Sequence, residues 1–121
     1  MLPFARLLAA SSLDASPPGT WYCTSDGGAS YLTGARSWYG RDNDGDGYSY
    51  LYLPIAAPKG GTFRLSFRTE GQAVSHPGGT ARPGLTQYDF RLGAGQSVNM
   101  FIRTDAQVDT YVTNIIIEQI G

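Results

Sequence analysis

Apolar and polar residues alternate with a period of two along much of this chain. The clearest segment is 62–69, where Phe63, Leu65 and Phe67 are separated by polar residues. Segment 48–55 alternates in the same way and carries three tyrosines on one face. Because strand side chains point alternately to opposite faces of a sheet, both segments predict half-buried strands. Further strands are predicted at 20–24, 30–33, 36–40, 87–92, 97–103 and 110–120.

These segments define an all-β fold. About eight short strands, separated by turn residues, are typical of an antiparallel β-sandwich of the jelly-roll type. The run Ile115–Ile117 has no polar interruption and predicts a central strand that is buried on both faces. Residues 71–86 are rich in Gly and Pro and are expected to form a long connection.

The first eighteen residues differ from the rest. Their apolar residues have the spacing of one face of a short helix, although an extended arm is also compatible with it. The breaker cluster at 16–19 separates this segment from the strands. We therefore expect a docking arm and linker at 1–18 and a β-sandwich domain at 19–121. The arm's apolar face could pack on its own domain, dock on a partner subunit or belong to a vestigial leader. Its docking residues are Leu2, Phe4, Leu7 and Leu8.

Charge and composition narrow the classes of partner. The chain has 121 residues, a net charge of −1 and nine basic residues that are scattered singly, so nucleic acid is not an expected partner. No apolar run approaches the length of a membrane span. Cys23 is the only cysteine, so a disulfide within the chain is impossible.

The segment 42–47 is the sharpest local motif. Asp42, Asp44 and Asp46 alternate with Asn and Gly, which matches the first half of a calcium-binding loop. The twelfth position would be Leu53, which has no carboxylate, and a strand follows instead of a helix, so an EF-hand is excluded. The alternatives that stay open are a calcium site of another kind and a polar hairpin turn.

Aromatic residues provide a second candidate site. Flat rings can stack on sugar rings beside polar groups, which makes a glycan-binding platform one interpretation. A subunit interface and simple core filling are the other two. The aromatic residues concerned are Trp21, Tyr22, Tyr31, Trp38, Tyr39, Tyr48, Tyr50 and Tyr52. The predicted platform consists of Trp21, Trp38, Tyr48, Tyr50 and Tyr52.

Catalytic residues are sparse. His76 lies in a Gly- and Pro-rich segment and is expected to be a surface histidine, and Cys23 is expected to be a buried apolar residue. Glycoside hydrolysis needs two carboxylates across a cleft, and Glu70 and Glu118 are the only glutamates. We therefore predict a protein that is not an enzyme.

Two segments carry a resemblance to a known family. They read GYSYLYLPIAAPKGGTFRLSFRTEG (47–71) and VNMFIRTDAQVDTYVTNIIIEQI (98–120). Their order of strand, turn and aromatic-led strand resembles carbohydrate-binding modules of the jelly-roll type, and similar domains of phage fibre and decoration proteins. The last strand of those modules usually carries an Asp-Asn pair, of which only Asn114 is present here, so no sugar-binding residue is transferred.

These features lead to one functional hypothesis and two alternatives. The leading hypothesis is a structural or attachment protein of a phage-like particle, such as a decoration, head-fibre or tail-fibre subunit. It would be a homo-oligomer, located in the virion or outside the cell, that docks on a capsid or tail through its arm and contacts surface glycans. The alternatives are a carbohydrate-binding module, free-standing or fused to an enzyme, and a small glycoside hydrolase.

Overall fold

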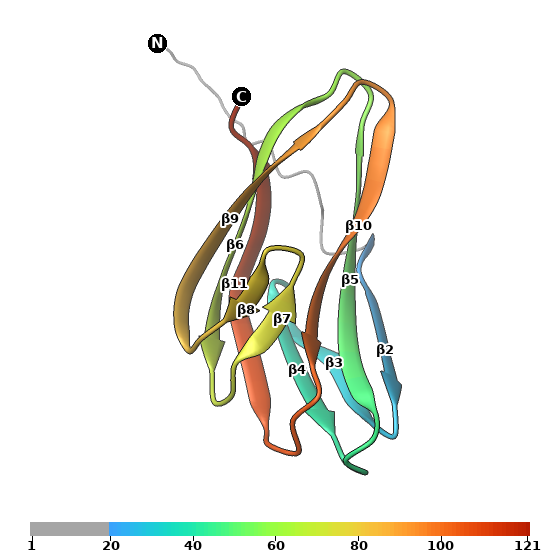
Figure 1. The fold of residues 1–121 in the computed structure, drawn as a ribbon, viewed down its shortest axis with the longest axis vertical. Coiled ribbons are helices and arrows are strands. Elements are labelled where there is room, and N and C mark those ends of the chain that lie inside the picture. The colour runs from blue at the N-terminus through green and yellow to red at the C-terminus, as the bar shows by residue number, and fades with distance from the viewer. Residues whose placement is uncertain (1–19) are drawn as a thin grey trace.

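The computed structural model describes residues 20–121, which form a sandwich of two antiparallel sheets (Figure 1). The predicted docking arm, with Leu2, Phe4, Leu7 and Leu8, lies outside the described residues. Residues 20–121 contain no helix that could cross a membrane. The predicted all-β sandwich is confirmed for this part of the chain.

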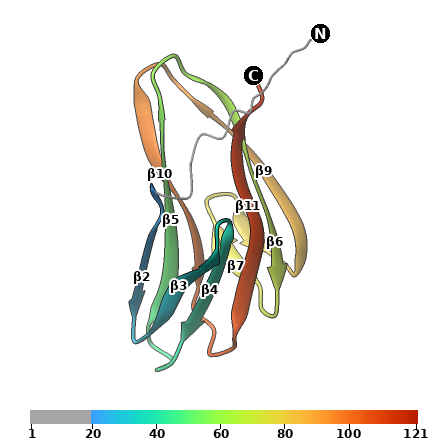
Figure 2. The same ribbon diagram turned by 180° about the vertical axis from the view of Figure 1, so that it is seen from behind.

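Each sheet has five strands. The first sheet contains, in spatial order, β2 (Tyr22–Asp26), β5 (Tyr48–Ala57), β10 (Gln96–Thr104), β7 (Val74–His76) and β8 (Gly79–Ala81). The second sheet contains β3 (Gly28–Gly34), β4 (Ser37–Asp42), β11 (Thr110–Gln119), β6 (Gly61–Glu70) and β9 (Gly84–Leu92). The chain crosses repeatedly between the two layers, so neighbouring strands are often distant in sequence (Figures 1 and 2).

The described chain has ten strands, two more than the predicted eight. The additional pair is the short hairpin of β7 and β8, which lies within the predicted long connection 71–86. Gly and Pro dominate this segment, so its period-two pattern is too short to recognise in the sequence. Val74 and Ala81 nevertheless point into the core.

The predicted burial of the isoleucine run is only partly correct. Strand β11 is the central strand of the second sheet, and Ile115 and Ile117 are buried, but Ile116 is 36% exposed. The pairing of β11 with β6 shifts in register between Thr113 and Ile116, and Asn114 has a φ of 53°. A β-bulge of this kind re-aims the side chains that follow it.

The core fills the space between the two sheets. It is built from the inward residues of both layers, and its largest members are Trp38 and Phe67. Fully burying an aromatic or aliphatic side chain of this kind stabilises a fold by about 1.5–3 kcal/mol. The core therefore leaves the outward faces of the sheets available for other roles.

A hydrogen-bond chain links the two sheets through Trp38. The indole Nε1 of Trp38 donates to Ser30 Oγ at 2.9 Å, and Ser30 Oγ donates to the carbonyl oxygen of Tyr50 at 2.6 Å. Gly40 makes room for the indole, since a Cβ at this position would lie 2.3 Å from the ring. Trp38 thus fixes β3 and β4 against β5.

Candidate functional site

The outward face of the first sheet carries a ladder of aromatic rings. Tyr48, Tyr50 and Tyr52 alternate with buried residues of β5 and share its outward side. The ring centroids of Tyr48 and Tyr50 are 4.9 Å apart, and those of Tyr50 and Tyr52 are 5.4 Å apart. All three side chains are half-buried, because each ring covers its neighbour.

Strand β10 adds two residues that the sequence analysis did not select. Phe101 is opposite Tyr52 and Arg103 is opposite Tyr50 in the sheet. The Phe101 ring meets the Tyr50 ring edge-on at 5.9 Å. The alternation of segment 97–103 could have identified both residues, since a strand whose even-numbered residues face the core must direct its odd-numbered residues outward.

Arg103 is held in place by three neighbours. Its guanidinium carbon lies 5.0 Å from the centroid of Tyr48 and 4.9 Å from that of Tyr50. Its Nη1 donates to the Tyr50 hydroxyl and its Nε donates to Asp105, both at 2.5 Å. The Asp105 hydrogen bond raises the pKa of Arg103. The cation is therefore fixed and locally neutralised at the surface of the ladder.

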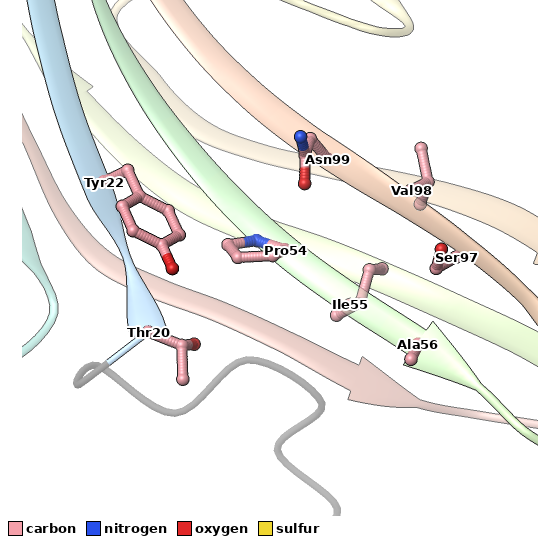
Figure 3. Close-up of a pocket in the computed structure, with 8 residues that line it drawn as sticks. All are labelled: Thr20, Tyr22, Pro54, Ile55, Ala56, Ser97, Val98 and Asn99. Atoms are coloured by element: carbon pink, nitrogen blue, oxygen red, sulfur yellow. The ribbon is translucent and has the colours of Figure 1, made fainter.

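A hollow of about 560 Å³ is lined by residues of β5 and β10 together with Tyr22 (Figure 3). One of its lining residues is Pro54, the next outward residue after Tyr52 on β5. Tyr22 extends from β2 at its edge and is 63% exposed. Pro54 and Asn99 are directly opposite each other on β5 and β10, and both line the hollow. The remaining lining residues are Thr20, Ile55, Ala56, Ser97 and Val98.

We call this surface the ladder face and define it by Tyr22, Tyr48, Tyr50, Tyr52, Asn99, Phe101 and Arg103. It combines an exposed ring, a hollow and fixed hydrogen-bonding groups. Such a surface can stack against the apolar face of a sugar ring while polar groups meet its hydroxyls.

Both tryptophans must be removed from the predicted platform. Trp38 is fully buried and Trp21 is 8% exposed, and both belong to the core. Trp21 directly precedes β2, and Trp38 lies in β4. In the interior of the sandwich, a tryptophan ring removes more apolar surface from water than it does on an outward face. The core-filling interpretation applies to these two residues.

The aspartate loop forms a tight turn between β4 and β5. The Asp42 carboxylate accepts backbone N–H groups from Asp44 and Gly47, each at 3.3 Å, and Asp44 accepts the N–H of Asp46 at 3.0 Å. A Cβ at Gly47 would lie 1.7 Å from the Asp26 carbonyl oxygen, so only glycine fits there. Asp42 therefore stabilises the turn through hydrogen bonds to its own backbone.

The environment of Asp42 also shifts its titration. Its side chain is buried, and this desolvation raises the pKa of the carboxyl. The backbone N–H donors outweigh that cost and hold the pKa below its ordinary value. The Asp42 carboxylate is thus charged, and backbone N–H groups of its own loop supply its hydrogen bonds.

Calcium at this loop stays a prediction. Within residues 20–121 no three acidic, histidine or cysteine side chains form a group that could hold a metal ion. A site would have to use backbone carbonyls together with Asp42, Asp44 and Asp46. A thermal melt with calcium and with chelator tests it, and an equal midpoint in both would exclude calcium binding.

His76 is buried, which corrects its predicted surface position. Strand β7 turns it inward between the rings of Phe67 and Tyr88, at 5.7 and 5.4 Å. Its Nδ1 accepts the N–H of Gly78, and burial lowers its pKa. Cys23 packs against the core and is half-buried, and desolvation raises the pKa of its thiol. Both groups are neutral packing residues at pH 7.

The two glutamates are too far apart for glycoside hydrolysis. Glu118 of β11 is directly opposite Arg64 of β6 in the sheet. Glu70 lies six residues after Arg64 on β6. At about 3.3 Å per residue the separation is about 20 Å, against at most about 9.5 Å for the carboxyl pair of a glycosidase. These residues cannot act as such a pair.

Comparison of the sequence with protein families and with curated proteins gives no match. Solved structures match in fold. The enzymatically active domain of tailspike protein 4 from bacteriophage CBA120 has a TM-score of 0.59 at 9% identity over 93% of this chain. The chain spans about a fifth of that protein, since 22% of it is covered.

Carbohydrate-binding modules of family 29 match over almost their whole length. An arginine variant of one module, CBM29-2, has a TM-score of 0.52 at 13% identity, covering 90% of this chain and 89% of the module. Another variant, in complex with cellulohexaose, has a TM-score of 0.50 at 11% identity, with 89% of both chains covered. The fold of this chain is therefore similar to that of carbohydrate-binding modules and of a phage tailspike domain.

Proposed function

We propose that this domain binds neutral glycans on the ladder face and performs no catalysis. The observation that carries the proposal is the combination of the exposed Tyr22 ring, the adjoining hollow and the fixed Arg103 on one sheet face. Arg103 is paired with Asp105, so the face offers hydrogen bonds without a net charge that would select an ionic ligand.

The similar modules support this interpretation. One of them is described in complex with cellulohexaose, and variants at an arginine and at an aspartate two positions later are described as probes of its ligand recognition. In this chain, Arg103 contacts Asp105 beside the ladder face and lies over the rings of Tyr48 and Tyr50. From this geometry we assign to Arg103 the role of orienting the sugar hydroxyls above the rings, with Asp105 holding it in place.

Calorimetric titration with cellulohexaose, supported by a glycan array, tests the proposal. We expect Arg103→Ala and Tyr22→Ala each to weaken binding by about fivefold or more, since stacking and cation contacts at a ring each contribute about 1 kcal/mol or more. The matched control is Arg91→Ala, which removes an exposed arginine whose hydrogen bond goes to Thr62 on the second sheet. Equal losses in the variants and the control would refute the ladder face as the site.

A phage-like particle is the location that we propose for this activity. The tailspike domain has the same fold, and tailspikes are components of a phage tail. The domain would then act as a decoration, head-fibre or tail-fibre subunit, docked through residues 1–18 and forming a homo-oligomer. A free-standing carbohydrate-binding module is the alternative.

Deletion of residues 1–15 separates these two locations. In the attachment protein the deletion abolishes incorporation into particles, which mass spectrometry of purified particles detects, while glycan binding by the isolated domain is kept. In a free-standing module there is no particle to enter, and the full chain would be a monomer in sedimentation. Normal incorporation of the shortened chain would refute the docking role.

A further inference from the structure

The outward face of the second sheet carries a separate row of tyrosines. Tyr31 of β3 is opposite Tyr39 of β4, and Tyr39 is opposite Tyr111 of β11. The ring centroids are 5.0 Å apart for Tyr31 and Tyr39 and 5.2 Å for Tyr39 and Tyr111. Tyr31 is 52% exposed and Tyr111 is 44% exposed. We call these three residues the tyrosine row.

The middle ring of the row is fixed by charged neighbours. The Tyr39 hydroxyl donates to Asp109 Oδ1 at 2.7 Å, and Arg41 Nη1 donates to the same oxygen at 3.0 Å. The Asp109 hydrogen bond raises the pKa of Tyr39, and the two donors hold the pKa of Asp109 below its usual range. Tyr39 is thus a fixed support for the two more exposed rings.

The end of the row offers further polar groups. Tyr111 is opposite Glu70 of β6, whose side chain is exposed. Within residues 20–121, Asp109 Oδ2 accepts no hydrogen bond, and the hydroxyls of Tyr31 and Tyr111 are not engaged. Three consecutive rings across the sheet are therefore followed by the Glu70 carboxylate and flanked by the free oxygen of Asp109.

The charges on this face balance. Four arginines and four acidic residues face outward on it, so they cancel, and two of the arginines are paired at 3.0 and 2.7 Å. They are Arg41, Arg64, Arg68 and Arg91 with Glu70, Asp89, Asp109 and Glu118. A phosphate backbone would need an excess of cations, which this face does not have.

Two exposed aliphatic residues of this sheet lie away from the row, whereas Leu32 follows Tyr31 in β3 and is 37% exposed. Leu85 is on β9, opposite Arg68, and Ile116 follows the bulge of β11, opposite Ser66. A stable protein interface has a continuous apolar centre, whereas here polar residues separate Leu85 and Ile116 from the rings. This arrangement fits a sugar better than a second protein.

We propose that the tyrosine row is a second binding site for a neutral glycan, on the face of the sandwich opposite the ladder face. Tyr31 and Tyr111 stack on the sugar rings, and Asp109 and Glu70 accept hydrogen bonds from sugar hydroxyls. The site shares no residue with the ladder face, so it does not depend on the function proposed there. With both sites occupied, one domain bridges two glycan chains.

A titration of single-face variants with cellulohexaose, combined with a glycan array, tests this proposal. The row variant is Tyr31→Ala/Tyr111→Ala, the ladder variant is Tyr22→Ala/Arg103→Ala, and a fourth protein combines both pairs. We expect two ligands per wild-type chain, one per single-face variant and no binding by the combined protein. Circular dichroism and urea unfolding establish that each variant is folded, and Leu85→Ala is the matched control on the second sheet.

The possible outcomes separate the two sites. Unchanged stoichiometry and affinity in the row variant would overturn the second site and leave the ladder face intact. Loss of all binding in the row variant, with full binding in the ladder variant, would support the row and refute the ladder face. An array on which no glycan binds the wild-type chain would refute both.

Self-association is the competing role of the row, and a second experiment decides it. Sedimentation at increasing concentration compares the wild-type chain with the row variant. We expect no difference in their association. A dimer that forms in the wild type and is absent from the row variant would overturn the glycan assignment. Mixing the wild-type domain with a soluble long-chain glucan should produce turbidity by cross-linking. Where the chain sediments as a monomer, either single-face variant should abolish this turbidity, because a monomer with one site cannot bridge two glycan chains.

Discussion

The ladder face and the tyrosine row are both built from tyrosines, but the rings are arranged along a strand in the first and across strands in the second. The ladder runs along β5, so successive rings at i and i+2 cover one another and Arg103 covers two of them. The row runs across β3, β4 and β11, and its outer rings stay about half exposed. Direction relative to the strand therefore decides how much of an aromatic surface stays available to a ligand.

Trp38→Ala should have the largest effect, because it removes the largest core residue between the two sheets that carry the ladder face and the tyrosine row. Loss of a fully buried tryptophan costs about 3–5 kcal/mol, and here the Ser30 hydroxyl also loses its donor. Urea unfolding measures the loss. Ser30→Ala is the matched control, with an expected cost of about 1–3 kcal/mol, and a cost equal to that of Trp38→Ala would show that packing contributes little.

Asp42→Asn should weaken the loop that joins the two faces. The Asp42 carboxyl has a lowered pKa in the folded state, so its stabilisation is present at neutral pH. It is lost as the pH falls below the ordinary value of about 4 and through the folded pKa. The difference between the wild-type and variant urea midpoints should therefore narrow from pH 7 to acid. Asp46→Asn, at an exposed position of the same loop, is the matched control.

Tyr50→Phe tests the hydrogen bond between Tyr50 and Arg103 on the ladder face. The variant keeps the ring under Arg103 but removes the hydroxyl that accepts from its Nη1. We expect a loss of about 1 kcal/mol in unfolding free energy and an affinity for cellulohexaose that falls less than in Arg103→Ala. An equal fall in both variants would mean that the hydroxyl, and not the cation over the rings, governs binding.

Asp109→Asn should have the smallest effect on stability, since its ion pair with Arg41 is solvent-exposed. Its signature is spectroscopic. Because hydrogen bonding to Asp109 raises the pKa of Tyr39, the variant should bring this pKa back toward about 10. Alkaline titration of tyrosinate absorbance detects the change. An unchanged titration curve would show that Asp109 does not fix the row.

The fold was accessible from sequence wherever a period of two extends over a whole strand. The tyrosines of β5 and the core residues of β6 were placed on the correct faces for this reason. The hairpin of β7 and β8 escaped because three-residue strands are too short to show a period. The exposure of Ile116 was missed because the outward face of the second sheet is not covered, and the bulge before Ile116 directs this residue to that face.

The candidate sites were less accessible because they depend on which strands are neighbours. Tyr31, Tyr39 and Tyr111 come from three strands, one of them far along the chain, and only the register of the sheet makes them adjacent. A single sequence does not contain this register. The burial of Trp38 has a similar origin, since it depends on the small residues Ser30 and Gly40 next to it.

The position of the two tryptophans determines which events change the intrinsic fluorescence of this protein. Trp38 is fully buried and Trp21 nearly so, while both proposed sites contain only tyrosine and phenylalanine rings. Tryptophan emission should therefore respond to unfolding and stay silent when a ligand binds. Tyrosine absorbance and ring resonances are the signals that report occupancy, and a change in tryptophan emission on ligand addition would indicate a rearrangement of the core itself.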